Sequence, residues 1–217
     1  PDLPPANTFY SLIQCADETL VAMRDSVSGK ELNFALRRVS DGMAQNAALA
    51  IRAALLLGVR VDTVRERLAL WQPAALRCEL RREDGRLFYI DCYNANPAAM
   101  ADALEAFYAV APDIEPRLLV IGCMEELGAE SGQYHRTLGR SIRLRRQDHL
   151  VVIGGDAEAV RQGAIGNGAA PQQVEVVTTL APVRERLTHF HGAVFIKGSR
   201  RYQLETILNG EAALAAH

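Results

Sequence analysis

Residues 91–97 read Asp-Cys-Tyr-Asn-Ala-Asn-Pro and follow the apolar run 87–90 directly. This order predicts a strand that ends at Asp91, a short turn, and a helix that begins at Pro97 with Asn96 as its N-cap. The carboxylate of Asp91 can accept hydrogen bonds from sugar hydroxyls, and a helix N-terminus favours an anion. Ligands of α/β proteins often bind at such turns. An ordinary capped turn is the competing interpretation.

A second polar segment, with Lys197, Ser199 and Arg200, follows the apolar residues 194–196 and precedes a predicted helix. A lysine and a helix N-terminus can both hold a carboxylate. Asp91 and Lys197 each come at the carboxyl end of a predicted strand, so we expect both at the same edge of one sheet. The alternative is a surface loop with polar residues at a helix start.

Three blocks of this chain resemble motifs of the bacterial Mur ligases, and they occur in the same order. Residues 91–97 match D-x-Y-N-A-N-P, residues 119–128 are similar to V-x-G-x-M-x-E-L-G, and residues 194–200 look like V-K-G-S-R. The resemblance is to the MurF type, which adds D-alanyl-D-alanine to a UDP-muramoyl-tripeptide, and it covers roughly residues 40–208. Three ordered motifs are far more specific than any one of them.

The resemblance implies roles for individual residues. By it, the nucleotide is bound by Asn46, Arg77, Asp91 and Asn94, with Asn46 and Asn94 near the adenine and the other two near the ribose and phosphates. It places Lys197, Ser199 and Arg200 near the dipeptide substrate. No residue of this chain is expected to be catalytic or to bind a metal.

The chain departs from the family pattern at two places. Residues 40–42 read Ser-Asp-Gly where the family has a histidine segment, and Cys123 stands where an aspartate is usual. Both changes bear on nucleotide contact or substrate choice.

No G-x-x-x-x-G-K-[ST] phosphate loop occurs in the sequence. The Mur ligases bind ATP phosphates and Mg²⁺ in a central domain, which the resemblance would place before residue 1. We therefore expect a C-terminal portion of an ATP-dependent amide ligase, either truncated or a reduced relative, whose partners are the missing domains and small-molecule substrates. The chain alone is expected to lack ligase activity, because phosphoryl transfer needs the lysine and Mg²⁺.

The elements expected to carry these residues fall into two domains that meet near Pro73. In residues 1–72 we expect an irregular start to residue 17, a hairpin of strands 18–24 and 31–39 with a turn at 26–29, and helices 44–57 and 61–71: a remnant of the central domain. Residues 73–217 alternate short apolar strands with helices, which predicts an α/β, Rossmann-like and mostly parallel sheet with helices on both faces. The expected strands are 77–82, 87–90, 117–121, 150–153, 174–177 and 193–196, and the expected helices are 97–110, 130–146, 157–163, 181–189 and 200–209, before a frayed tail from residue 212.

Bulk properties exclude several classes of protein. The 217 residues carry a formal net charge of −2 and are 49% hydrophobic, which gives no basis for nucleic-acid or membrane-surface binding. No apolar run approaches the ~20 residues that span a bilayer, and the start lacks a signal peptide. Four scattered cysteines predict reduced thiols in a cytoplasmic protein.

Three alternatives stay open. Another Mur-type ligase, similar to folylpolyglutamate synthase or cyanophycin synthetase, is one, although residues 93–96 and 197–200 favour the MurF type. A non-catalytic Rossmann-like binding module is the second, which the absent phosphate loop favours if residue 1 is near the native start. A nicotinamide-dependent enzyme ranks low, because no G-x-G-x-x-G follows a strand.

Overall fold

The computed structural model describes residues 8–15, 17–25, 29–114 and 116–208. The chain divides into two compact units, residues 1–72 and 73–217. The predicted turn at 26–29 falls mostly outside the described residues, as does the tail from residue 212. No helix among the described residues is long and apolar enough to span a bilayer.

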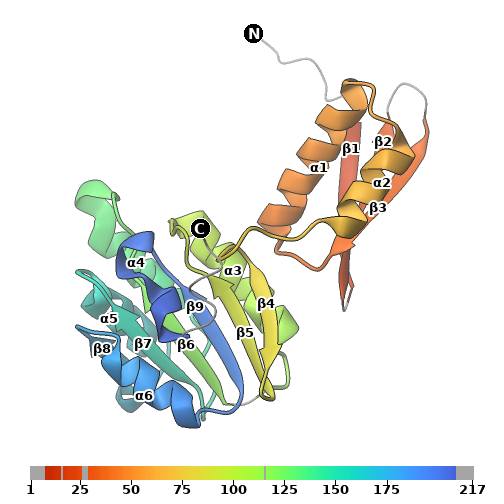
Figure 1. The fold of residues 1–217 in the computed structure, drawn as a ribbon. Coiled ribbons are helices and arrows are strands. Elements are labelled where there is room, and N and C mark those ends of the chain that lie inside the picture. Colours follow the sequence, from red (N-terminus) through yellow and green to blue (C-terminus); the bar gives the residue numbers. More distant parts are fainter. Residues whose placement is uncertain (1–7, 16, 26–28, 115, 209–217) are drawn as a thin grey trace. The chain divides into compact units, whose positions relative to one another are not determined.

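The first unit is a three-stranded antiparallel sheet with two helices (Figure 1). Its elements are β1 (Thr8–Gln14), β2 (Glu18–Asp25), β3 (Glu31–Arg37), α1 (Asp41–Leu56) and α2 (Val61–Leu70). Both helices pack on one face of the sheet around a core that includes Phe34 and Ile51. Ser40 is the N-cap of α1, and its Oγ accepts from the Met43 amide at 3.3 Å.

The expectation that residues 1–17 are irregular is wrong for residues 8–14, which form β1. Strand β1 pairs with β2 from Thr8↔Asp25 to Gln14↔Thr19. The backbone hydrogen bonds that stabilise β1 are made to β2, so the sequence of residues 8–14 alone does not predict them.

The second unit is built on a six-stranded sheet of order β4-β5-β9-β6-β7-β8 (Figure 1). Only β4 is antiparallel to its neighbour. The strands are β4 (Glu79–Glu83), β5 (Arg86–Asp91), β6 (Arg117–Gly122), β7 (His149–Ile153), β8 (Val174–Val177) and β9 (Ala193–Lys197). The last strand of the sequence thus lies between β5 and β6, so the loops after these three strands meet at one edge.

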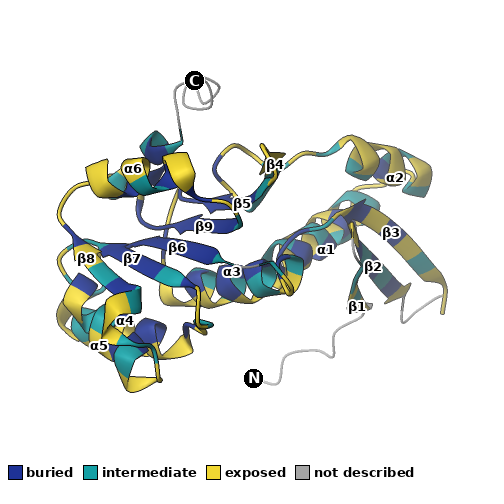
Figure 2. Ribbon diagram, turned by 90° about the horizontal axis from the view of Figure 1, so that it is seen from below, coloured by how far each residue is buried: buried dark blue, intermediate teal, exposed yellow. Residues whose placement is uncertain are grey.

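Helices cover both faces of this sheet, which confirms the predicted α/β architecture. Helices α3 (Pro97–Val110), α4 (Ser131–Ser141) and α5 (Ala157–Gly166) pack on one face, and α6 (Ala181–His189) packs on the other. Figure 2 shows buried strands between partly exposed helices. Neighbouring residues of β5 point to opposite faces of the sheet. Tyr89 packs in the core under α3, α4 and α5, and Phe88 packs in the core under α6.

Two predicted helices differ from the structure. The helix expected over 130–146 ends at Ser141, because Ile142 turns to an extended conformation (ψ 127°) and is buried. The helix expected over 200–209 is two short 3₁₀ turns, Arg200–Tyr202 and Leu204–Ile207, separated by Gln203 at φ 46°. That left-handed residue interrupts the helical path, and Leu204 and Ile207 enter the core beside α6.

A buried ion pair joins β6 to β7 at the amino edge of the sheet. Asp148 is fully buried and accepts from the Arg117 amide at 2.9 Å and from Arg117 Nε at 2.8 Å. The Arg145 amide donates to the same carboxylate at 2.8 Å. Each charge is thus surrounded by hydrogen-bond partners, the condition under which a buried pair is tolerated.

Helices α4 and α5 approach closely because each presents a glycine at their crossing. A Cβ added at Gly139 would lie 2.1 Å from the Val160 carbonyl oxygen, and one added at Gly163 would lie 2.2 Å from the Arg136 carbonyl oxygen. Backbone therefore contacts backbone, with no room for a methyl group.

We expect Asp148→Asn to lower the free energy of unfolding of the second unit by about 3–5 kcal/mol, because Arg117 would remain buried without its countercharge. The control is Glu175→Gln, which removes the half-exposed pair with Arg186 and should cost at most about 1 kcal/mol. Because the two units can unfold separately, hydrogen exchange of the β6 amides is the measurement. Equal effects of both variants would contradict the prediction.

We expect Gly139→Ala to destabilise the second unit by about 1–3 kcal/mol, because the methyl group would force the helices apart. Gly132 lies on the same helix, and its added Cβ would meet only Asp156 Oδ1 at 3.7 Å. Gly132→Ala should therefore be neutral or stabilising, by up to about 1 kcal/mol from helix propensity. Urea denaturation followed by circular dichroism distinguishes the two variants, and similar midpoints would refute the crossing argument.

Candidate functional site

Asp91 and Lys197 meet at the carboxyl edge of the sheet. They are register partners at the ends of the parallel strands β5 and β9. Lys197 Nζ lies 2.6 Å from Asp91 Oδ2. The structure thus places on one edge, and in direct contact, two residues that are 106 positions apart in the sequence.

The ammonium of Lys197 is fully engaged within this edge. Besides Asp91 Oδ2, Nζ donates to the Asp91 carbonyl at 3.3 Å and to the Asn94 carbonyl at 3.2 Å. An ammonium has three N–H donors, and the Lys197 side chain is only 1% exposed. The contact predicted between Lys197 and a substrate carboxylate stays a prediction, and it would require the pair with Asp91 to open.

The turn after β5 is held by its own asparagines. Asn94 Oδ1 accepts from the Ala95 amide at 2.8 Å, and Asn96 Oδ1 caps α3 by accepting from the Ala99 amide at 2.9 Å. Pro97 occupies the first helical turn, as predicted. The conformation of this turn is therefore fixed by its own asparagine side chains and by the hydrogen bond from Lys197 to the Asn94 carbonyl.

Arg77 lies over the ring of Tyr93, with its guanidinium carbon 4.0 Å from the ring centroid. Both side chains are exposed, and the Tyr93 amide donates to the Leu76 carbonyl at 3.3 Å. Leu76 and Cys78, on either side of Arg77, have positive φ values of 63° and 49°. The chain therefore turns sharply to bring Arg77 to residues 91–97, and the ring restrains a guanidinium that can still reach solvent.

Ser199 and Arg200 lie in the loop that follows β9. Ser199 Oγ accepts from the Arg201 amide at 3.4 Å, which caps the first 3₁₀ turn. Arg200 forms an ion pair with Glu205 Oε1, and Glu205 Oε2 lies 3.8 Å from Cys92 Sγ. Burial, and next the nearby carboxylate of Glu205, raises the pKa of Cys92 to about 12, so the thiol keeps its proton.

The loop after β6 contributes Glu125, which Tyr202 Oη and Arg201 contact. Burial, and next the hydrogen bond to Glu125, raises the pKa of the Tyr202 phenol. Glu125 therefore orders this loop, whereas its neighbour Glu126 is exposed at φ 62°.

His135 has a structural role. Its Nε2 accepts from the Met124 amide at 2.9 Å, so the proton of the neutral ring lies on Nδ1, which is 2.8 Å from the Ser131 carbonyl. The ring is fully buried, and it ties α4 to the loop after β6.

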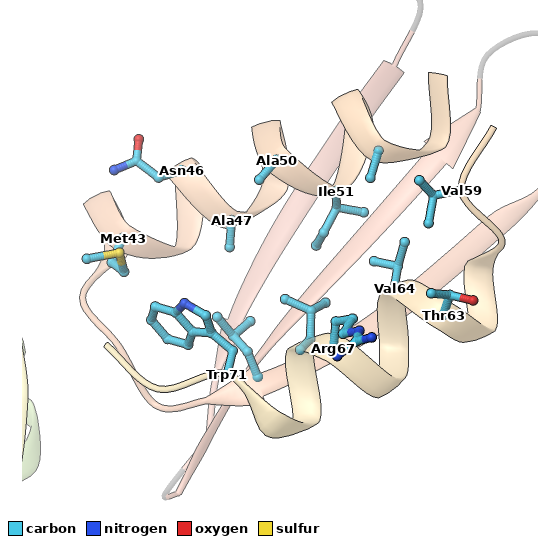
Figure 3. Close-up of a pocket in the computed structure, with 13 residues that line it drawn as sticks. Met43, Asn46, Ala47, Ala50, Ile51, Val59, Thr63, Val64, Arg67 and Trp71 are labelled. Atoms are coloured by element: carbon cyan, nitrogen blue, oxygen red, sulfur yellow. The ribbon is translucent and has the colours of Figure 1, made fainter. Parts of the chain in front are cut away.

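Asn46 belongs to the first unit, on the exposed side of α1. It borders an apolar pocket of about 400 Å³ between α1 and α2. Figure 3 shows its amide at the edge of this pocket, pointing away from Val64 of α2, while the Trp71 ring lies at the end of the pocket near Met43 and Ala47.

Six of the seven predicted site residues lie in the second unit: at the ends of β5 and β9, on the loops that follow these strands, and just before β4. Sequence reasoning missed three residues that organise them: Tyr93, Glu205 and Cys92. Tyr93 and Cys92 lie inside the motif of residues 91–97, which was a usable signal. The sequence analysis did not identify Glu205: its ion-pair partner Arg200 is only five residues away, but its contact with Cys92 is long-range.

The described residues offer no site suited to Mg²⁺. No three His, Cys, Asp or Glu side chains within the described ranges are grouped to hold a metal ion. Asp91, the carboxylate of the predicted nucleotide site, is already neutralised by Lys197.

Comparison with known proteins gives consistent matches. Residues 76–200 match the family model described as Mur ligase, glutamate ligase domain. The UDP-N-acetylmuramoyl-tripeptide–D-alanyl-D-alanine ligase of Haemophilus influenzae is 28% identical over 193 residues, which are 82% of this chain and 39% of that protein. The chain thus spans about two fifths of the length of this relative.

Solved structures agree with this match. A MurF crystal structure from Acinetobacter baumannii superposes with a TM-score of 0.75 at 26% identity, covering 93% of this chain and 44% of that one. The MurF ligase of Thermotoga maritima in complex with ADP has the same fold, with a TM-score of 0.72 at 23% identity over 93% of this chain and 45% of that one. With more than half of its residues matched by the family model, and with the strand-end motifs assembled at one edge, the chain belongs to the Mur ligase family.

Proposed function

We propose that this chain is the C-terminal part of an ATP-dependent ligase of the MurF type. In the proposed reaction, ATP phosphorylates the carboxylate of a UDP-muramoyl-tripeptide. The amine of D-alanyl-D-alanine then attacks the acyl phosphate, which yields an amide, ADP and phosphate. The observation that carries the proposal is the contact between Asp91 and Lys197, because it joins two family motifs into one site.

Three of the four proposed nucleotide contacts, Arg77, Asp91 and Asn94, belong to the second unit. Asp91 uses Oδ2 on Lys197, and a carboxylate has a second oxygen that can accept from a ribose hydroxyl. Arg77 suits phosphate oxygens because a guanidinium presents a planar fork of donors, and stacking on Tyr93 limits the entropy lost on binding. Asn94 and Asn46 are assigned to the adenine, since an amide both donates and accepts.

The proposed dipeptide contacts come from the loop after β9. Arg200 is the direct ligand of the dipeptide carboxylate, with Ser199 beside it at the start of the 3₁₀ turn. Lys197, the residue of β9 that precedes this loop, fixes the start of the loop through its ion pair with Asp91. The buried ammonium also offsets the charge of Asp91, which favours a nearby anionic ligand.

We assign residues 1–72 to the end of a central ATP-binding domain and residues 73–217 to the C-terminal domain. The missing central and N-terminal domains are the proposed partners. The Mg²⁺ that accompanies ATP in phosphoryl transfer is assigned to those domains, because the described residues do not fit it. The Thermotoga maritima relative bound to ADP supports a nucleotide as ligand.

We expect the full-length protein to release phosphate only when ATP, UDP-muramoyl-tripeptide and D-alanyl-D-alanine are all present, and the 217-residue chain to release none. Malachite-green detection with mass spectrometry of the product is the measurement. Replacing the dipeptide with L-alanine or glutamate tests another Mur-type ligase. Peptide-dependent phosphate release by the chain alone would refute the assignment of its role.

We expect Arg77→Gln to weaken ADP binding to this chain about tenfold, because a charge-assisted contact to phosphate is lost. Arg77 is exposed, so stability should change little. Arg81→Gln on β4 is the matched control: it removes the same charge nearby, but Arg81 pairs with Glu79 at 2.6 Å. Calorimetric titration gives both affinities, and equal losses would indicate only a general effect of net charge.

A further inference from the structure

We propose that Glu205 is a positioning residue that aims the Arg200 guanidinium at the carboxylate of the incoming dipeptide. The inference rests on the proposed function, which names Arg200 as the carboxylate ligand. It adds the residue that holds Arg200 and a physical reason why a buried acid occupies this place.

The pair of Arg200 and Glu205 is asymmetric in burial. The Glu205 side chain is 11% exposed, whereas that of Arg200 is 49% exposed. A buried carboxylate is held in place by its surroundings, and a half-exposed arginine follows its partner. In the neighbouring pair of Arg201 and Glu125 both side chains are more exposed, at 72% and 30%, so that carboxylate is less firmly held.

Glu205 uses its two oxygens on two different loops. Oε1 pairs with Arg200, and Oε2 faces the Cys92 thiol at 3.8 Å. Cys92 directly follows Asp91 and is fully buried. Its raised pKa keeps the thiol protonated, so S–H can donate to the carboxylate. Glu205 therefore links the proposed dipeptide loop to the strand end that carries the proposed ribose contact.

The segment around Glu205 cannot swing freely. Leu204 and Ile207, on either side, are buried in the core beneath α6. Arg184 of α6 donates to the Thr206 carbonyl and to Thr206 Oγ1, each at 3.0 Å. With its backbone held at both neighbours, Glu205 presents a fixed carboxylate to Arg200.

Arg200 keeps the capacity to bind a second carboxylate. Its contact with Glu205 is made through one terminal nitrogen, and a guanidinium has five N–H donors. A carboxylate is bound bidentately by two parallel N–H groups. The pair with Glu205 thus fixes the direction of the fork and removes rotamer freedom that binding would otherwise have to restrict.

The test uses the 217-residue chain and two ligands, D-alanyl-D-alanine and ADP, titrated by NMR. Glu205→Gln should weaken dipeptide binding five- to tenfold and leave ADP binding unchanged. The Arg200 Nε–Hε signal of the ligand-free variant should broaden or shift, because the guanidinium loses its fixed partner. Glu175→Gln, which removes an acid from a remote pair with Arg186, should change none of these.

Each outcome decides the inference. An unchanged Arg200 signal in Glu205→Gln, or equal losses for dipeptide and ADP, would overturn it while the proposed function stands. A wild-type chain that binds ADP but no dipeptide would overturn the substrate assignment itself, and the inference with it. If Glu205→Gln does not fold, Glu205→Asp serves instead: its shorter carboxylate should weaken dipeptide binding partially and still shift the Arg200 signal.

Discussion

The buried contact between Lys197 and Asp91 is the constraint on which the site depends. A lysine that is 1% exposed is tolerated only when its charge is paired and its N–H groups are satisfied. Here all three N–H groups donate to Asp91 and Asn94. These bonds fix the end of β9 to the end of β5 and to the turn before α3. Every other proposed contact in the second unit is positioned relative to this pair.

Strand order explains why such a pair can form. The last strand, β9, inserts between β5 and β6, and the loops after all three strands converge. A glycine makes the convergence tight: a Cβ at Gly198 would lie 2.6 Å from the Cα of Gly122, so the loop after β9 passes β6 backbone to backbone. In open α/β sheets, a point where the strand order reverses is the common place for a ligand.

The amino edge of the sheet contributes to stability, and the carboxyl edge carries the proposed binding residues. At the amino edge, Arg117 and Asp148 form a saturated pair that leaves little for a ligand to contact. At the carboxyl edge, two buried groups hold more exposed ones: Lys197 holds the turn after β5, and Glu205 holds Arg200. Arg77 is restrained by the exposed ring of Tyr93. Supports of this kind keep binding side chains in place and reduce the entropy lost when a ligand arrives.

Local signals in the sequence determined the elements. Helix 97–110 was predicted to the residue, because Asn96 and Pro97 mark its start by capping chemistry that acts over three residues. The apolar runs determined the parallel strands, and the ordered motifs determined the family. Tertiary structure decided what depends on distant partners: β1, whose hydrogen bonds come from β2; the 3₁₀ turns after Arg200, bent by burial of Leu204; and the burial of Lys197 and Glu205. The charge partner of Lys197 lies 106 residues away, beyond the reach of any local pattern. Glu205 pairs with Arg200, five residues away, but the Cys92 thiol that meets its other oxygen lies 113 residues away.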